Sequence, residues 1–456
     1  MNSRRSIRLA LVALLTLVAA TLAPGAITGA GAAATAYTDP LETIGASERA
    51  GYGLRWNAVT PETTANLDSK LNNVGVTEVL ESANHPARSC NAAERGTLPT
   101  APTASASFCW DTGDATTPDW HPQSITSSGD ADDDGAWGTN RLILAGWSYV
   151  GTGTGDARYN TVRVAFIDYN NPAAPKYRWV LLVTPTSGGE NFARVAAHAG
   201  GMAWYGDKLF VSGQQGHTNA IYVFSMEHIL QASVNSSAIG KVDGGYSAWG
   251  YQYVMPAIGS YSYDAGACTG NVNTAVPCVG SLSLDRSSVP NSLVTTEYLN
   301  NGTKGRMLRY NFGSNYLLNS STASGSFVPA VQGYRSGVGN MQGVLAHNNV
   351  WYVAHASASS GVHGHLWGQT TTRSVATCGG TYQCWAEHPE SLTYWQSAGQ
   401  VWSLTEWENP ADSVRRTPVH APLLKRGAGR RHTTLTGCRT TASKRYPCVF
   451  GTAVSG

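Results

Sequence analysis

The sequence predicts an all-β fold, a β-propeller of five blades, in a protein that is exported from the cell. Three observations lead to this prediction: an N-terminal export signal, a composition poor in charge, and a recurring pattern of strand, turn and strand. Charged residues make up 13 % of the 456-residue chain, which also holds 50 Gly, 14 Trp and 21 Tyr. Aromatic residues favour strands and glycine favours turns, so this mixture is typical of many short strands joined by loops.

The N-terminal region 1–36 has the three parts of a signal peptide. Three arginines occur within the first eight residues, an apolar run covers 9–23, and the tripeptide Ala-Thr-Ala at 34–36 fits cleavage before Tyr37. The run is too short to span a membrane, so we expect no membrane span after cleavage. The paired arginines also fit a loose twin-arginine signal, which leaves the export route open.

The eight cysteines occur as four close couples: Cys90/Cys109, Cys268/Cys278, Cys378/Cys384 and Cys438/Cys448. Eight cysteines allow 105 pairings, so spacing alone does not fix the connectivity. Export and local clustering favour four short-loop disulfides. A metal site is the alternative, but the chain has no C-x2-C pair.

Strand-like runs separated by Gly, Asn, Asp or Pro begin near residue 120. They cover 142–149, 161–169, 177–184, 208–212, 220–226, 252–258, 281–285, 293–299, 306–311, 328–334, 350–355 and 400–405.

A weak repeat groups these runs into units of about four strands. In each unit a polar residue precedes an apolar strand, and a short turn leads into an aromatic-rich strand. The units cover 120–185, 198–258, 279–335, 340–387 and 388 onward. Repeated four-stranded units are typical of propeller blades. A sixth blade would need strands from residues 40–115, and a large β-sandwich is the alternative architecture.

We expect residues 37–118 to form an N-terminal segment with one helix and a disulfide loop, and 119–410 to form the propeller. The helix is predicted over 61–73, because Thr60 suits the N-cap and Pro61 the first turn. Residues 411–456 are basic and irregular, which indicates either a polyanion-binding tail or a disrupted last blade. The second interpretation is preferred, and a strand at 51–59 would then be needed to close the ring.

An acidic loop, Asp130-Ala-Asp-Asp-Asp-Gly135, matches the start of a calcium-binding loop. Alternate carboxylates in this pattern converge on one Ca²⁺, which implicates Asp130, Asp132 and Asp134. Position 12 of the motif is Arg141 instead of Glu. A solvated acidic loop without metal is the alternative.

The first residues of each inner strand reach the mouth of a propeller's channel, where we expect a ligand site. The residues at or near these positions are Trp120, His121, His198, Gln342 and His388, with Asp119, Arg194, Glu387 and Glu390 nearby. Imidazole suits proton transfer near neutral pH. We expect catalytic roles for His121, His198, His388 and Arg194, and substrate contacts from Gln342, Glu390 and Trp120. A hydrogen-bonded structural role is the alternative for each histidine.

A second histidine group, His363, His365 and nearby His355, resembles a short metal-binding tract, although surface histidines without a ligand are the preferred interpretation. The chain has no G-x-S-x-G elbow, H-E-x-x-H pair, phosphate loop or dinucleotide fingerprint. Serine hydrolases, zincins and nucleotide enzymes are therefore disfavoured. A net charge of +2 gives no reason to expect nucleic-acid binding.

Several segments together resemble a group of secreted actinobacterial propeller-like proteins. They are Trp120–Gln123, Arg163–Asp168, Tyr177–Val183, Val195–Asp207, Tyr251–Pro256, Ser283–Ser287 and Met341–Leu345. The resemblance covers residues 120–407 and implies the propeller fold, but it supplies no activity. The basic tail after residue 410 departs from the group's pattern.

The leading functional hypothesis is a secreted, monomeric propeller that binds an extracellular carbohydrate and cleaves it by lyase or hydrolase chemistry. One histidine would be the base, and Arg194 would neutralise a uronate. A non-catalytic cell-surface binding module and a calcium-stabilised structural protein are the alternatives.

Overall fold

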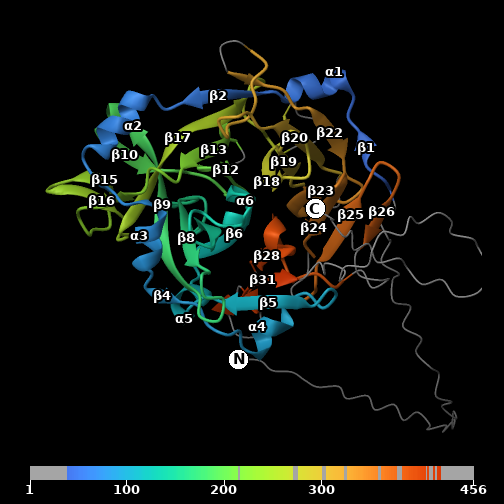
Figure 1. The fold of residues 1–456 in the computed structure, drawn as a ribbon, viewed down its shortest axis with the longest axis horizontal. Coiled ribbons are helices and arrows are strands. Elements are labelled where there is room, and N and C mark those ends of the chain that lie inside the picture. Colours follow the sequence, from blue (N-terminus) through green and yellow to red (C-terminus); the bar gives the residue numbers. More distant parts are fainter. Residues whose placement is uncertain are drawn as a thin grey trace, which may run out of the picture. The chain divides into compact units, whose positions relative to one another are not determined.

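The computed structural model describes residues 39–406 except 214–215, 271–275, 300–303, 323–325, 358–360 and 377–382, with the backbone of three short strands beyond residue 407. The predicted signal peptide and most of the basic tail lie outside the described residues. The fold is mostly β, and the strands follow one another in antiparallel sets (Figure 1). No described helix is long and apolar enough to cross a membrane.

The first two strand sets form one large sheet. Their strands are β6 (Trp120–Ser127), β7 (Leu142–Tyr149), β8 (Val162–Asp168) and β9 (Lys176–Thr186), then β11 (Met202–Tyr205), β12 (Lys208–Ser212), β13 (Asn219–Ser225) and β17 (Tyr253–Tyr263). Each set is antiparallel, and the long outer strands β9 and β17 join the sets by parallel pairing.

The third and fourth sets are separate sheets. The third contains β18 (Val279–Asp285), β19 (Ser292–Glu297), β20 (Arg306–Asn311) and β22 (Gln332–Arg335), with β1 (Glu42–Thr43) on its edge. The fourth contains β23 (Met341–His347), β24 (Val350–His355), β25 (His365–Gln369) and β26 (Ser374–Ala376). The predicted run 328–334 is divided between β21 (Phe327–Val328) and β22.

The last set combines strands near the C-terminal end of the described chain with one strand of the N-terminal segment. Its order is β27 (Pro389–Trp395), β28 (Gln400–Thr405), β31 (Pro418–Pro422) and β5 (Ala104–Cys109). The preferred interpretation of a disrupted last set is thus corrected, because β31 continues the sheet. The closing strand was also predicted wrongly: β2 (Leu54–Ala58) pairs with β17 and β21 instead.

The first strands of the five sets, β6, β11, β18, β23 and β27, contact one another in a nearly closed, barrel-like ring. Each contacts the next strand in this order, and β27 returns to β6. Five hydrophobic cores fill the spaces between successive sets.

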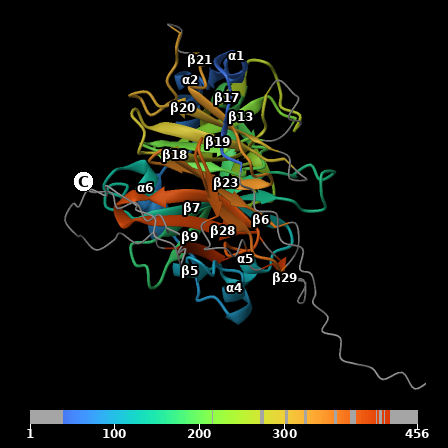
Figure 2. The ribbon, with the colours of Figure 1, turned by 90° about the vertical axis from the view of Figure 1, so that its right-hand side faces the viewer.

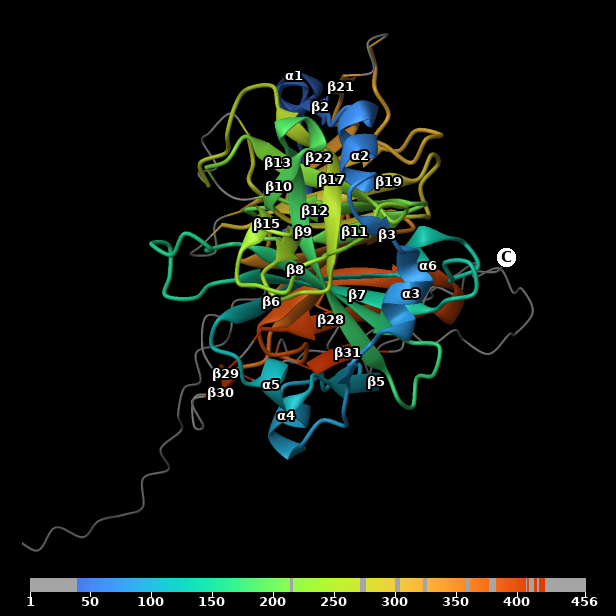
Figure 3. The ribbon, with the colours of Figure 1, turned by 90° about the vertical axis from the view of Figure 1, so that its left-hand side faces the viewer.

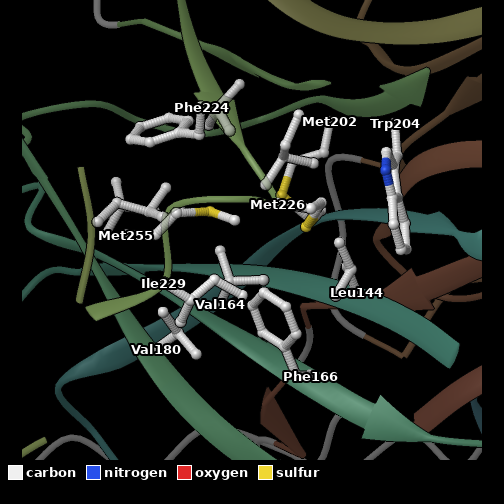
Figure 4. Packing of buried hydrophobic residues seen from close by; sticks show 14 of the residues in the cluster. Leu144, Val164, Phe166, Val180, Met202, Trp204, Phe224, Met226, Ile229 and Met255 are labelled. Atoms are coloured by element: carbon white, nitrogen blue, oxygen red, sulfur yellow. The ribbon is translucent and has the colours of Figure 1, made fainter. Parts of the chain in front are cut away.

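Strand periodicity explains how one sheet can serve two of these cores. On β8, Val162, Val164 and Phe166 enter the core shared with the second set, whereas Ala165 and Ile167 enter the core shared with the last set. Successive side chains of a strand point to opposite faces of its sheet, so a strand buried on both faces has a continuous apolar sequence. Figure 4 shows Val164 and Phe166 of β8 packed near Met202 and Trp204 of β11.

The N-terminal segment contains several short helices instead of the single predicted one. They are α1 (Ala46–Arg49), η1 (Ala50–Tyr52), α2 (Pro61–Asp68), α3 (Gly75–Glu81), α4 (Ala92–Gly96) and α5 (Thr112–Ala115). The predicted start of α2 is confirmed, since the Thr60 side chain accepts a hydrogen bond from the Thr63 amide at 3.2 Å. The helix ends at Asp68, because residues 72–73 form β3 and pair with β14.

Four of these helices lie beside the last strand of a set. Helices α2 and α3 contact β9 (Figure 3), and α4 and α5 lie near β5 (Figure 2). The remaining short elements are β3 (Asn72–Asn73), β4 (His85–Pro86), α6 (Ser128–Ala131), η2 (Ser187–Gly189), β10 (Asn191–Arg194), β14 (Leu230–Gln231), β15 (Ile239–Val242), β16 (Gly245–Ala248), η3 (Gln396–Ala398), β29 (Glu408–Asn409) and β30 (Val414–Arg415).

Two of the four predicted disulfides are present among the described residues, Cys90–Cys109 and Cys268–Cys278. Cys384 is also disulfide-bonded. The remaining cysteines of the predicted couples, Cys378, Cys438 and Cys448, lie outside the described residues.

Candidate functional site

The first strand of a set begins where the second strand of that set ends, so both contribute residues to one face. Four of the five first strands also have a β-bulge near their start, at Gln123, Gly280, Gln342 and Ser391–Leu392. A bulge adds a residue on one strand and re-aims the neighbouring side chains. The bulges therefore lie where the sequence predicted the site.

Glu406 is the centre of a polar cluster on this face. It directly follows β28, and its amide donates to the His388 carbonyl at 3.1 Å. Its Oε1 lies 2.6 Å from His121 Nδ1 and accepts from Gln123 Nε2 at 2.8 Å. Its Oε2 lies 3.3 Å from His388 Nδ1. We call His121, His198, His388, Glu390 and Glu406 the Glu406 cluster.

The two carboxyl groups of the cluster resist ionisation. Burial raises the pKa of Glu390 well above its usual range, and the charge of Glu406 raises it further. Burial also raises the pKa of Glu406, although His198, His388 and the Gln123 hydrogen bond oppose this shift. Glu390 is 1 % exposed, and its Oε1 has no hydrogen-bond partner. An unpaired buried oxygen of this kind is costly.

His198 joins the cluster from the segment before β11. Its side chain is exposed to solvent, yet the surrounding protein lowers its pKa through desolvation, while Glu406 opposes that shift. The lowered pKa keeps this imidazole neutral, and thus able to accept a proton, at neutral pH.

His388 is held in an unusual backbone conformation. Its φ is +38°, and Ser391, on the other side of Glu390, has a φ of +53°. Side chains other than glycine rarely adopt this region, and such strain is often found at functional sites. Burial lowers the pKa of His388 to about 4, although Glu406 opposes that shift.

Three other predicted site residues have different surroundings. Arg194 donates to the Tyr159 carbonyl at 3.0 Å, and no described contact joins it to Glu406. Trp120 is 7 % exposed and packs against Tyr149, with ring centroids 5.2 Å apart. Trp120 is therefore part of an interior core instead of an open sugar platform. Gln342 is half-buried in the bulge at the start of β23.

The acidic loop does not bring its three predicted calcium ligands together. Asp130 is buried, and it accepts from Thr126 at 2.7 Å and from Thr393 at 2.6 Å. Asp132 and Asp134 are exposed and bind backbone amides of their own loop. Burial raises the pKa of Asp130 to about 6, and the two threonine hydroxyls oppose that rise.

The second histidine group is ordered by pairing between two strands. His355 of β24 lies opposite His365 of β25, and their Nδ1 atoms are 2.9 Å apart. Burial lowers the pKa of His355 to about 4, and the charge of His365 lowers it further. His363 forms an isolated bridge with Glu387 and binds the Trp385 carbonyl at 2.6 Å.

Another polar cluster surrounds Asp114 in the N-terminal segment. This Asp114 cluster contains His85, Asp111, Asp114, Arg163, Tyr177 and Trp179. Asp114 accepts from Arg163 at 2.8 Å, Tyr177 at 2.7 Å and Trp179 at 3.0 Å. His85 lies between the two acids, 2.5 Å from Asp111 and 3.4 Å from Asp114.

Glu406, Gln123 and Tyr298 belong to the candidate site but were not predicted from the sequence. Burial and the charges of Glu390 and Glu406 raise the pKa of Tyr298, and Tyr298 is 36 % exposed. Tyr298 directly follows β19, and Glu406 directly follows β28. These are the second strands of their sets, and they end on the face where the first strands begin. Extending the search from strand starts to the ends of the hairpin partners would have identified them.

A surface pocket of about 520 Å³ lies away from the Glu406 cluster, beside Tyr334, Trp351 and Arg373. None of the predicted site residues lines it. It has few ionisable groups, so the chemistry of the site is better sought at Glu406.

Comparisons with known proteins give no family. No family model and no curated protein matches the sequence. Distant structural similarity is found to Kuenenia stuttgartiensis hydrazine synthase, which is 11 % identical with a TM-score of 0.29, covering 64 % of this chain and 76 % of that one. Chaetomium thermophilum Sqt1 is 10 % identical with a TM-score of 0.25, covering 65 % and 71 %. Drosophila Plexin A, solved with Semaphorin 1b, is 7 % identical with a TM-score of 0.24, covering 67 % and 88 %. These likenesses are too weak to support a function.

Proposed function

We propose that the chain is a secreted, five-bladed β-propeller that binds an acidic extracellular carbohydrate at the Glu406 cluster and cleaves it. The blade count is supported by the five strand sets and by the five cores between successive sets. Completion of the last set by β5 is also what closure of a ring of blades requires. The disulfides are compatible with export.

One observation supports the site above all others: distant segments converge on Glu406. His121 is 285 residues away from Glu406 in sequence and His388 is 18 residues away, yet both lie within hydrogen-bonding range of its carboxylate or close to it. His198 comes from a further set and contributes to the same electrostatic environment. Recessed clusters of ionisable groups with shifted pKa values are common at catalytic sites.

The groups have complementary protonation behaviour. His198 has a lowered pKa and is open to solvent, so it is suited to accept a proton from a bound sugar. Glu390 and Glu406 have raised pKa values, so one of them is suited to donate a proton to the leaving glycosidic oxygen. In a lyase reaction, His198 would remove the proton next to the uronate carboxylate, and the glycosidic C–O bond would then break.

Tyr298 supplies a ring on which a sugar can stack. It is partly exposed, and its pKa is raised by burial and by the charges of Glu390 and Glu406, which places it near both acids. Aromatic rings with an apolar face and a polar tip suit wet binding sites. We therefore assign substrate contact to Tyr298 instead of Trp120.

The proposal is tested by incubating the exported protein with polygalacturonate, alginate and hyaluronate. Unsaturated uronate products report a lyase, and new reducing ends without unsaturation report a hydrolase. His198→Ala and His388→Ala should each lower turnover by roughly 100-fold or more, as expected for loss of a proton-transfer group. His228→Ala is the matched control, since His228 pairs with Asp68 at 2.7 Å outside the cluster.

Unchanged turnover in both cluster variants would remove the catalytic roles. Glycan binding without any product would instead favour the binding-module alternative, and Tyr298→Ala should then weaken the binding.

A further inference from the structure

The Glu406 cluster offers three metal-ligand atoms at one point. The ligand atoms of His388, Glu390 and Glu406 all lie within 4.8 Å of one another. The set mixes one imidazole nitrogen with carboxylate oxygens. Such a mixture suits a divalent transition metal, whereas Ca²⁺ prefers a shell made of oxygens alone.

Glu390 gives a second, independent reason to expect a ligand. Its side chain is almost fully buried, and its Oε1 has no hydrogen-bond partner. Among the described residues, no lysine or arginine forms an ion pair with Glu390 or Glu406. Two adjacent buried acids without a permanent positive charge resist ionisation, and a bound cation would favour their ionised form.

The surroundings of Glu406 hold it in a suitable orientation. Gln123 and His121 both bind Oε1, at 2.8 Å and 2.6 Å, so Oε2 is directed to the side of His388. Hydrogen bonds to one oxygen of a ligating carboxylate are the usual means of fixing the other oxygen toward a metal. His121 and Gln123 are thus positioning residues in this arrangement.

We propose that His388, Glu390 and Glu406 bind one divalent transition-metal ion, of which Zn²⁺ and Mn²⁺ are the test ions. This inference rests on the proposed function and changes one role in it, because Glu390 and Glu406 are ionised as metal ligands and neither donates the proton while the ion is bound. Arg194 lies elsewhere, so the predicted partner for a uronate carboxylate is absent from the described cluster. Without a metal, Glu390 and Glu406 resist ionisation and offer a uronate carboxylate no positive charge, whereas a cation held between them would attract it.

The test measures metal binding directly, with no substrate present. Untagged, full-length exported protein is stripped with EDTA, dialysed and titrated with ZnCl₂, MnCl₂ and CaCl₂ by isothermal titration calorimetry. We expect one Zn²⁺ or Mn²⁺ per chain and much weaker Ca²⁺ binding. Glu406→Gln and Glu390→Gln should each weaken binding by roughly 100-fold or more, and Gln123→Ala by roughly 10-fold or more.

His85→Gln is the matched control, because His85, Asp111 and Asp114 also place ligand atoms within 4.8 Å of one another. Asp114 there is already paired with Arg163, so His85→Gln should leave metal affinity unchanged. Circular dichroism on each variant confirms folding. Absence of binding by the wild-type protein, or equal affinity in wild type and Glu406→Gln, would overturn the metal site.

The outcomes separate this inference from the proposed function. Metal binding without recognition of any uronate-containing glycan would disprove the proposed function and keep the metal site. Glycan cleavage by wild-type protein that binds neither Zn²⁺ nor Mn²⁺ in the titration would keep the function and disprove the metal site.

Discussion

Asp114 and Glu406 are both carboxylates surrounded by polar side chains, but their surroundings differ in one respect. Asp114 has a permanent cation, because Arg163 pairs with it at 2.8 Å. The Arg163 guanidinium in turn lies 3.6 Å from the centre of the Trp179 ring and 4.3 Å from that of Trp120. Glu406 is bound by an amide and by histidines, and next to it Glu390 has an oxygen without a partner.

This difference teaches how to distinguish a scaffold cluster from a ligand site. A buried carboxylate that is neutralised and fully hydrogen-bonded by its own chain has no need of a ligand. A buried pair of acids without such neutralisation lowers the stability of the fold. Such destabilising groups are typical of sites where a ligand binds and neutralises them. The histidines alone do not reveal the distinction, because each cluster contains at least one.

The largest expected effect comes from breaking the neutralised cluster. Asp114→Ala leaves Arg163, Tyr177 and Trp179 without their acceptor in the interior. Removing one partner of a buried ion pair typically costs about 3–5 kcal/mol. Urea unfolding should show a loss of this size, with metal affinity unchanged once the variant is folded. A loss below about 1 kcal/mol would contradict the scaffold role.

Asp130 tests whether hydroxyl donors can replace a directly paired cation, since its carboxylate binds Thr126 and Thr393 and only the nearby charge of Arg286 acts on it. Its pKa is about 6 in the folded protein against an ordinary value of 3.8. The folded state therefore binds the proton more tightly, so stability that is fully present below pH 3.8 is lost as the pH rises through about 6. At about 1.4 kcal/mol per pKa unit, the loss approaches ~3 kcal/mol.

Asp130→Asn provides the measurement for this prediction, since it keeps the shape and one acceptor oxygen. Unfolding free energies of both proteins between pH 4 and 7 should diverge, with the variant gaining relative to the wild type as pH rises. Parallel pH curves would show that Thr126 and Thr393 stabilise the ionised carboxylate fully.

The smallest expected effect is a gain in the free energy of unfolding, in contrast to the loss expected for Asp114→Ala. Glu390→Gln replaces a buried acid that ionises in the unfolded chain but resists ionisation in the fold, so the metal-free protein should become more stable by roughly 0.5–2 kcal/mol at pH 7. Chemical unfolding in EDTA measures this gain. A loss of stability like that of Asp114→Ala would mean that Glu390 is a scaffold residue.

The secondary structure was largely predictable because its causes are local. Strands β7, β12, β20, β24 and β28 match the predicted bounds residue by residue. Alternating apolar faces and Gly or Asn turns determine such strands within a few residues of sequence. The hairpin β15–β16 was missed because its strands are only four residues long and lack a run of apolar residues, although Tyr246 and Ala248 are buried in a core.

The site was predicted in part. His121, His198 and His388 were identified from their positions in the repeat, and the structure brings them together. Glu406 and Tyr298 were missed because only the starts of first strands were searched. Arg194 was predicted beside the histidines from sequence proximity to His198, but its side chain turns to Tyr159.

The sequence by itself determined the strands, the repeat and the positions from which histidines reach one face, because periodicity and turn chemistry act over short distances. Tertiary structure alone decided that β5 completes the last set, that Glu406 lies at the meeting point of the histidines, and that Arg163 neutralises Asp114. These contacts join residues far apart in the sequence, such as Cys109 of β5 and Pro418 of β31. Such pairings depend on which sheet faces pack together, and no local pattern encodes that choice.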